Sequence, residues 1–255
     1  MTIGSRALFR CSCPGRFVAS SLLAGALFCA LACGSTQSEP AQTPSDQSAS
    51  PQQGIVNRSA EALTKLRQGP QGAAFEAYLS HARGVMVFPR VVKASLLVGG
   101  EGGNGVLVIK RPDGSWSEPA FYSLGAPSIG LQIGYQEATV VLFVMDDDTL
   151  RRVADASIEL GSKSGVTMGR ADQDDSTEGR VFTKKIYQLV EAQGAFAGIS
   201  LDGYVITPRD KHNVAYYGPT AAPWAILRGQ VPHQAGADVL TRALTVHSAS
   251  SPTSG

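Results

Sequence analysis

Cysteine is absent from most of this 255-residue chain. Cys11, Cys13, Cys29 and Cys33 all lie near the N-terminus. The residues after Cys33 therefore cannot form a disulfide with one another, a thiolate metal site or a cysteine nucleophile.

The usual signatures of catalysis are also missing. There is no G-x-S-x-G nucleophile elbow, and the four histidines share no metal-ligand spacing such as H-x-x-x-H. Ser200 beside Asp202 is a candidate nucleophile, but a strand of small and apolar residues explains the same segment. We therefore expect a protein that is not an enzyme and that uses no cofactor and no metal ion.

Two acidic clusters fit a metal site poorly. Asp172, Asp174, Asp175 and Glu178 superficially resemble a calcium loop, but the glycine at loop position six and the distal glutamate are missing. A solvated acidic loop is the favoured interpretation. Residues 146–148, three aspartates at a strand-to-helix junction, are expected to cap a short helix, with Asp148 as the cap.

A long apolar run is lacking as well. The uncharged stretch from Phe17 to Ala32 is shorter than the ~20 residues that a membrane-spanning helix needs. It follows Arg6, Arg10 and Arg16, and this order is typical of a secretory signal peptide, here residues 1–32.

The end of this run resembles a bacterial lipobox. Ala32 precedes Cys33, which would be acylated and become the first mature residue; the alternative is an ordinary signal peptide cut near Ala32. Gly34 replaces the aspartate that commonly retains such proteins at the inner membrane. We expect an exported protein, lipid-anchored in the outer membrane, with its domain in the periplasm or at the cell surface.

A strong net charge is absent too. The chain has 22 basic and 21 acidic residues, and three of the basic ones lie before residue 33. From residue 33 onward there are therefore 19 basic and 21 acidic residues, a net charge of −2. This balance argues against nucleic acid as a partner and against indiscriminate adhesion to acidic membranes. Any binding to lipid headgroups must come from a local patch.

What is present is a series of short apolar runs separated by glycine turns between residues 84 and 145, which is typical of consecutive strands. No helical pattern separates these runs, so antiparallel pairing is favoured. We expect an α+β fold, with a predominantly antiparallel sheet (a sandwich or barrel-like) flanked by a few short helices. The predicted strands are residues 85–88, 94–98, 106–110, 120–122, 129–135, 139–145, 157–160, 165–168, 180–191, 195–201 and 203–207.

Helices are expected at residues 57–66, 73–83, 149–154, 223–227 and 237–247. Residues 33–56 are predicted to be the lipidated cysteine and a disordered tether, since residues 34–53 contain almost no large apolar side chain. The folded domain is then residues 57–248, and residues 249–255 are a disordered tail.

The glycine run Gly100–Gly105 matches G-x-G-x-x-G. A dinucleotide site needs such a loop to open a helix, whereas here it leads into the apolar run 106–109, a predicted strand. We expect no nucleotide, and we interpret the glycines as a hairpin turn, a bulge or a close backbone approach.

An aromatic cluster, Trp116, Phe121 and Tyr122, lies in the middle of the strand region. Such residues are either core aromatics or an amphipathic surface for lipid. Three basic residues, Lys93, Lys110 and Arg111, are near them in the sequence and would form a headgroup site if they converged in space. Lys184-Lys185 and the pair Arg209/Lys211 are further basic positions.

Three blocks of this sequence resemble the SYLF domain, described from yeast actin-patch proteins and found also in bacterial lipoproteins. The blocks are ARGV leading to Phe88-Pro89, then GGEGGNGVL…DGSWSEPAFY…GLQIGYQ, and then GAFAGISLDGYVI…NVAYYG. The resemblance covers roughly residues 57–230. Ser95 stands where the family often has glycine, and the segment 161–193 is shortened.

Membership implies binding of phosphoinositides or other acidic lipids, in some members through an amphipathic N-terminal helix. The matching segment here, residues 57–67, has Leu63 and Leu66 opposite Arg58, Lys65 and Arg67 and is only weakly amphipathic. Actin, the partner of the yeast proteins, is not expected in a bacterial envelope.

We therefore expect a non-catalytic envelope lipoprotein that binds membrane lipid through Lys93, Lys110, Arg111, Trp116, Phe121 and Tyr122. The alternative is a structural or interaction protein of the cell envelope with no small ligand. The sequence does not identify a protein partner.

Overall fold

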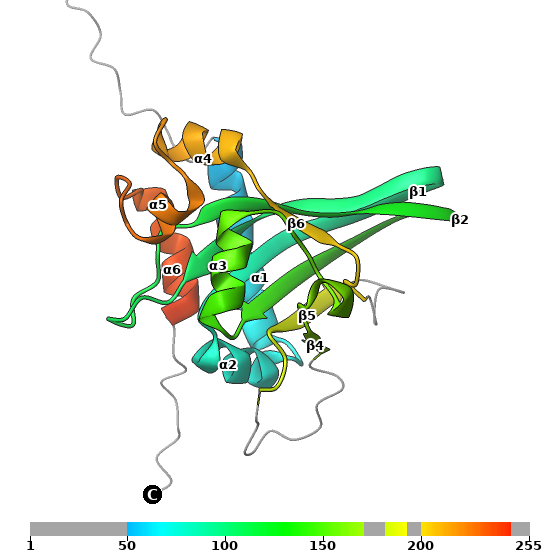
Figure 1. Cartoon of the computed structure of the whole chain (residues 1–255), viewed down its shortest axis with the longest axis horizontal. Helices are drawn as coiled ribbons and strands as arrows, with labels where there is room; N and C mark the ends of the chain where they lie inside the picture. The colour runs from blue at the N-terminus through cyan, green and yellow to red at the C-terminus, as the bar shows by residue number, and fades with distance from the viewer. Residues whose placement is uncertain (1–49, 171–181, 193–199, 246–255) are drawn as a thin grey trace, which may run out of the picture. The chain divides into compact units, whose positions relative to one another are not determined.

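The computed structural model describes residues 50–170, 182–192 and 200–245, with the backbone alone at 93–100, 127–136 and 170. The expected signal peptide, Cys33, most of the tether and the C-terminal tail lie outside these residues, as do the acidic loop at 171–178 and most of the strand expected at 195–201. The described part has the expected α+β fold, a mainly antiparallel sheet with short helices (Figure 1).

Two long strands form the centre of the sheet. β1 (Gly84–Ile109) and β2 (Ala120–Val144) pair antiparallel along most of their length. The sequence predicts six short strands here, and the structure joins them into two, because backbone hydrogen bonds continue through the glycine-rich stretches. One shift of register falls between Phe88 and Val91, where Pro89 has no N–H to donate to the ladder.

The glycine motif lies inside β1, where two segments of backbone approach each other closely. A Cβ atom at Gly105 would overlap the carbonyl oxygen of Val87, and one at Gly103 would overlap that of Arg90. The two ends of β1 are also joined, since the Lys110 amide donates to the Arg83 carbonyl at 2.9 Å. Close backbone approach is therefore the reason for these two glycines, as one of the three sequence interpretations predicted.

Four shorter strands complete the sheet along the other edge of β2. β6 (Val205–Pro208) pairs with the beginning of β2 and β5 (Ile186–Ala192) with its end, both antiparallel. β3 (Ile158–Glu159) lies outside β6, and β4 (Met168–Arg170) runs parallel to β5. The strand order is β3-β6-β2-β5-β4, with β1 on the opposite edge of β2.

Helix α1 (Pro51–Gln68) begins six residues before the predicted helix start at Asn57. The Ser50 hydroxyl accepts a hydrogen bond from the Gln53 amide at 3.0 Å, and Pro51 occupies the first helical position, which suits its fixed φ. Ile55 and Val56 are buried. Residues 51–56 therefore belong to the folded domain, and the expected tether cannot extend to residue 56.

Two further helices pack with α1. α2 (Gly72–His81) follows it after a short turn, and α6 (Asp238–Thr245) lies beside it although it comes from the other end of the chain. α1 also contacts β1, so its apolar face covers part of the sheet. In Figure 1, α1 lies behind the long strands and α3 lies in front of them.

The remaining helices are α3 (Asp147–Asp155), α4 (Asp210–Tyr217) and α5 (Pro223–Leu227). α5 has the predicted bounds. The cap of α3 is Asp146, whose side chain accepts from the Thr149 amide at 2.8 Å, and not the predicted Asp148. α4 was not predicted, because its sequence, DKHNVAYY, shows no apolar face at helical spacing.

Asn213 of α4 holds the first residues of β2 in place. Its side chain is fully buried, and its Oδ1 accepts a hydrogen bond from the Phe121 amide at 2.7 Å. The Phe121 carbonyl in turn accepts from the Arg209 amide at 2.9 Å, immediately before α4. The asparagine thus replaces a neighbouring strand as the partner of this part of β2.

Replacing Asn213 with leucine is expected to destabilise the protein by about 2 kcal/mol, because the buried Phe121 amide loses its acceptor. Urea unfolding followed by circular dichroism measures this loss. Asn213→Asp keeps the acceptor oxygen but places a charge in the core. Its stability is therefore expected to lie between that of the leucine variant and that of the parent. A leucine variant as stable as the parent would show that this hydrogen bond does not contribute.

Candidate functional site

The structure brings together three of the six residues that the sequence predicts as a lipid site. Lys110 pairs with Trp116 across the loop between β1 and β2, and the Arg111 Nη1 donates to the Trp116 carbonyl at 3.2 Å. Lys110 is exposed, Arg111 is half-buried and Trp116 is 7% exposed.

The other three predicted residues lie elsewhere. Phe121 and Tyr122 are completely buried, in agreement with the interpretation that they are core aromatics. The Tyr122 hydroxyl donates to the Ala154 carbonyl at 3.3 Å, which joins β2 to α3. Lys93 lies in β1 opposite Gln136, many residues along the ribbon from Lys110, and its side chain is outside the described atoms.

The loop itself is a Pro-Asp-Gly turn, residues 112–114. Gly114 has φ of 84° and donates its amide to the Arg111 carbonyl at 2.9 Å. The Asp113 carboxylate accepts from the amide and hydroxyl of Ser115, at 2.9 and 2.7 Å. These bonds hold Lys110 and Arg111 at the base of a rigid turn.

A second segment adds two residues that the sequence reasoning missed. At the C-terminal end of α5, the guanidinium of Arg228, the residue that follows the helix, lies over the Trp224 ring, 5.0 Å from its centroid. The Arg111 Nη2 is 3.1 Å from the place where a Cβ on Gly229 would stand, so Arg111 packs against the residue that follows Arg228. The four-residue spacing of Trp224 and Arg228 on a helix beginning at Pro223 was the available signal.

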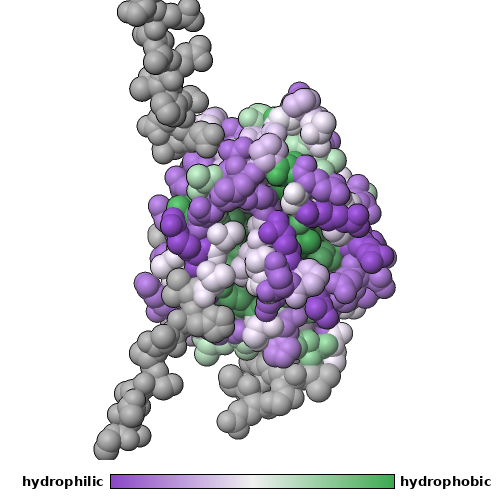
Figure 2. Space-filling model, turned by 90° about the vertical axis from the view of Figure 1, so that its left-hand side faces the viewer, coloured by the Kyte–Doolittle hydropathy of each residue, from purple (hydrophilic) through white to green (hydrophobic). Residues whose placement is uncertain are grey.

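We call this set the basic tryptophan surface: Lys110, Arg111, Trp116, Trp224 and Arg228. It contains both tryptophans of the chain. The side of Figure 1 that carries α5 faces the viewer in Figure 2, and hydrophilic side chains cover most of it, with small apolar areas between them. Of the two rings, only that of Trp224 is partly exposed, and cations next to such a ring suit the interface of a membrane.

Two carboxylates of the same loop lie close to this surface. The hydrogen bonds from Ser115, and then the charge of Arg111, lower the pKa of Asp113. Glu118 Oε1 lies 2.6 Å from Nδ1 of His233, and this hydrogen bond and charge raise the pKa of the histidine. The carboxylate of Glu118 is thus directed to His233, and Asp113 is the charge that most directly offsets Arg111.

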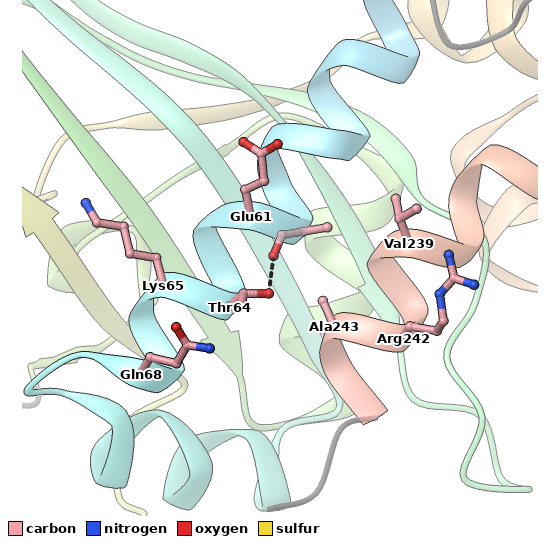
Figure 3. A pocket seen from close by; sticks show the side chains of 8 residues that line it. Glu61, Thr64, Lys65, Gln68, Val239, Arg242 and Ala243 are labelled. Carbon is pink, nitrogen blue, oxygen red and sulfur yellow. Dashed lines mark hydrogen bonds between the residues drawn. The ribbon is translucent and has the colours of Figure 1, made fainter.

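A groove of about 510 Å³ lies between α1 and α6 (Figure 3). Its charged residues have both signs, Glu61, Lys65 and Arg242, and Lys65 is already paired with Glu191 at 3.0 Å. This mixture is less suited to an acidic headgroup than the basic tryptophan surface. The other residues that line the groove are Ala60, Thr64, Gln68, Val239 and Ala243.

The predicted amphipathic helix is not free in this structure. Leu63 and Leu66 of α1 are buried in the core, and the Arg67 side chain, predicted on the polar face, is only 11% exposed. Binding to a membrane through the apolar face of α1 would require this helix to leave the domain.

Ser200 and Asp202 form a turn before β6. The Ser200 hydroxyl donates to Asp202 Oδ2 at 3.0 Å, and the Asp202 amide donates to Ser200 Oγ at 3.3 Å. Both residues are exposed, and these bonds account for the pair without catalysis. Within residues 50–170, 182–192 and 200–245, no three His, Cys, Asp or Glu side chains are grouped so that they could hold a metal ion.

None of the helices in the described ranges is both long enough and apolar enough to cross a bilayer. Taken together, the fold and the candidate surface define a mixed α+β domain with exposed basic and aromatic side chains of a kind suited to binding.

Comparison with known proteins agrees with this class. The profile of a family described as "Ysc84: Las17-binding protein actin regulator" matches residues 125–247. SH3 domain-containing YSC84-like protein 1 of Rattus norvegicus is 29% identical over 178 residues, which cover 68% of this chain and 52% of the rat protein. Protein YSC84 of Saccharomyces cerevisiae is 28% identical over 170 residues, covering 65% of this chain and 36% of the yeast protein.

LAS seventeen-binding protein 3 of the same yeast is 26% identical over 170 residues, which cover 65% of this chain and 37% of that protein. The chain thus spans about half the length of the rat relative and less of the yeast ones. No solved structure matches the chain significantly. These matches support a member of the Ysc84, or SYLF, domain family, in line with the three sequence blocks, and the names of the family and of its relatives describe binding proteins and regulators.

Proposed function

We propose that this protein binds acidic membrane lipids through the basic tryptophan surface, without catalysis. The observation that carries the proposal is the convergence of Lys110, Arg111 and Arg228 beside Trp116 and Trp224, from two segments far apart in the sequence.

The charges favour a local contact. Each Lys or Arg near an acidic membrane surface contributes about 1 kcal/mol, so three together contribute about 3 kcal/mol at low ionic strength. The mature chain has a net charge of −2, so these residues select acidic lipid at one place and the rest of the protein does not adhere. The exposed part of Trp224 would enter the headgroup region.

Co-sedimentation with vesicles tests the proposal. Residues 44–255 contain every described element and lack the leader, whose apolar run would bind membranes by itself. This chain is expected to sediment with phosphatidylglycerol vesicles and not with phosphatidylcholine vesicles. Reversing both exposed charges, Lys110→Glu with Arg228→Glu, is expected to weaken binding by about 30-fold or more, since two cations contribute about 2 kcal/mol.

The matched control is Lys184→Glu with Lys185→Glu, which changes the charge equally at two exposed residues next to β5. It is expected to retain most of the binding. Equal losses in both double variants, or no sedimentation of the parent with acidic vesicles, would contradict the proposal.

Attachment to the membrane is a separate part of the proposal. Acylation of Cys33 in an exported chain would hold the domain beside the outer membrane, and stable anchoring takes more than one lipid chain. The basic tryptophan surface would then find its lipid at high local concentration. Metabolic labelling with an alkyne fatty acid, in the parent and in Cys33→Ser, shows whether the chain is acylated.

A protein partner is the second candidate, favoured by the names of the yeast relatives and by the groove between α1 and α6. This candidate needs no lipid contact, so vesicle binding separates it from the first.

A further inference from the structure

A second groove lies on the glycine-rich part of the sheet, at the border of β1, β2 and β6. Its volume is about 430 Å³, within the range of roughly 300–1,000 Å³ that is typical of small-molecule pockets. Gly102 and Gly103 of β1 and Gly125 of β2 line it, so its floor is backbone. Part of the glycine motif that the sequence reasoning rejected as a nucleotide site therefore lines this groove.

The rim of this groove is polar and has one cation, Arg209, which is half-buried. Its backbone is fixed: its amide donates to the Phe121 carbonyl, and its own carbonyl accepts from His212 at 2.8 Å. Among the described residues, the Arg209 guanidinium has neither a hydrogen bond nor an ion pair. A guanidinium held at a groove without a carboxylate partner favours an anion.

Hydroxyl and amide groups surround this cation. Asn104 is exposed at the rim, and Ser123 and Thr207 come from the facing strands. Thr207 Oγ1 accepts from the Ser157 hydroxyl at 3.1 Å, which leaves the Thr207 proton available to a ligand. These groups can bind the hydroxyls of a small polyol while the guanidinium binds its phosphate.

Two acidic residues lie near the groove without lining it. Glu101 precedes Gly102 and therefore points to the other face of β1, where its carboxylate accepts from the Tyr204 hydroxyl. Asp210 is exposed in the first turn of α4, and Lys211 follows it. The groove itself thus carries the positive charge of Arg209.

We infer that this groove binds the phosphate monoester of a small polyol, with Arg209 on the phosphate and Asn104, Ser123 and Thr207 on the polyol. The ligand is either a free phosphorylated polyol or the headgroup of a lipid. In the lipid case the inference rests on the proposed function, whereas in the free case it does not.

Isothermal titration of the full chain, carrying Cys33→Ser, with sn-glycerol 3-phosphate tests the inference. Saturable binding is expected, and glycerol without phosphate should not bind. Arg209→Ala and Asn104→Asp are each expected to weaken binding about tenfold or more, the first by removing charge-assisted hydrogen bonds and the second by placing a negative charge at the rim. Arg209→Lys should restore part of the affinity.

The matched control is Lys211→Ala, which removes a neighbouring positive charge that does not line the groove. It should bind glycerol 3-phosphate like the parent. The Lys110→Glu, Arg228→Glu double variant should also bind this ester, so that loss of vesicle binding by the basic tryptophan surface can be distinguished from loss of ligand binding by this groove. Equal affinity for glycerol 3-phosphate and for short-chain phosphatidic acid would identify the free ester as sufficient; tighter binding of the lipid would assign the headgroup. No saturable binding of either probe, or unchanged binding in folded Arg209→Ala, would overturn the inference.

Discussion

Gly105→Ala is expected to destabilise the protein by about 3 kcal/mol or more, because the new methyl group would overlap the carbonyl oxygen of Val87 inside β1. A flexible side chain could turn away from such a clash, but a backbone carbonyl in a paired strand cannot move without breaking its ladder. The loss should appear in urea unfolding as a lower midpoint with an unchanged slope.

Gly54→Ala is the matched control, because it is the same substitution in a helix. Its Cβ would lie 3.3 Å from a terminal nitrogen of Arg58, which can move away. Alanine in a helix is favoured over glycine by about 0.5–1 kcal/mol, so this variant should be more stable than the parent. A Gly105→Ala variant that unfolds with the parent midpoint would show that the two halves of β1 do not approach as described.

Arg67→Met is expected to cost about 3 kcal/mol, since one guanidinium joins three helices. It pairs with Glu76 of α2 and donates to the carbonyls of Ala243 and Leu244, which lie in the last turn of α6. It also lies over the Phe75 ring, 5.1 Å from the centroid. Methionine keeps much of the apolar stem but leaves these carbonyls and the Glu76 carboxylate without their donor.

Lys65→Met, two residues earlier in α1, serves as the control for this prediction. Lys65 is 64% exposed and pairs with Glu191 at the surface, an interaction that contributes only about 0–1 kcal/mol. Both variants are compared by urea unfolding. Similar small losses in the two would show that Arg67 does not link α1 to α2 and α6.

The helices were the most predictable part of the fold. α5 begins at the expected Pro223, and α3 follows the expected aspartates, since capping and proline signals act locally. The early start of α1 at Pro51 was missed because the composition of the preceding segment is polar, although Ile55 and Val56 are buried. The length of β1 and β2 could not be predicted, because glycine is a turn signal in a sequence and here permits close packing between strand segments.

The candidate surface was also predictable only in part, because the sequence indicates contacts within one turn but not contacts between distant segments. Lys110, Arg111 and Trp116 lie in one loop, so their proximity follows from the turn. Trp224 and Arg228 come from a distant helix, and only the tertiary fold brings them to that loop. Burial of Phe121 and Tyr122 also depends on the helices that cover β2.

Tryptophan emission measures the central claim, contact of the basic tryptophan surface with lipid, most directly. The chain has two tryptophans, Trp116 and Trp224, and both belong to this surface. Vesicles of phosphatidylglycerol with brominated acyl chains should quench the emission of residues 44–255 more than unbrominated vesicles do. Most of this quenching should disappear in Trp224→Phe, because Trp116 is only 7% exposed. Sedimentation with these vesicles without any quenching would show that the protein binds lipid through another surface and would contradict the account.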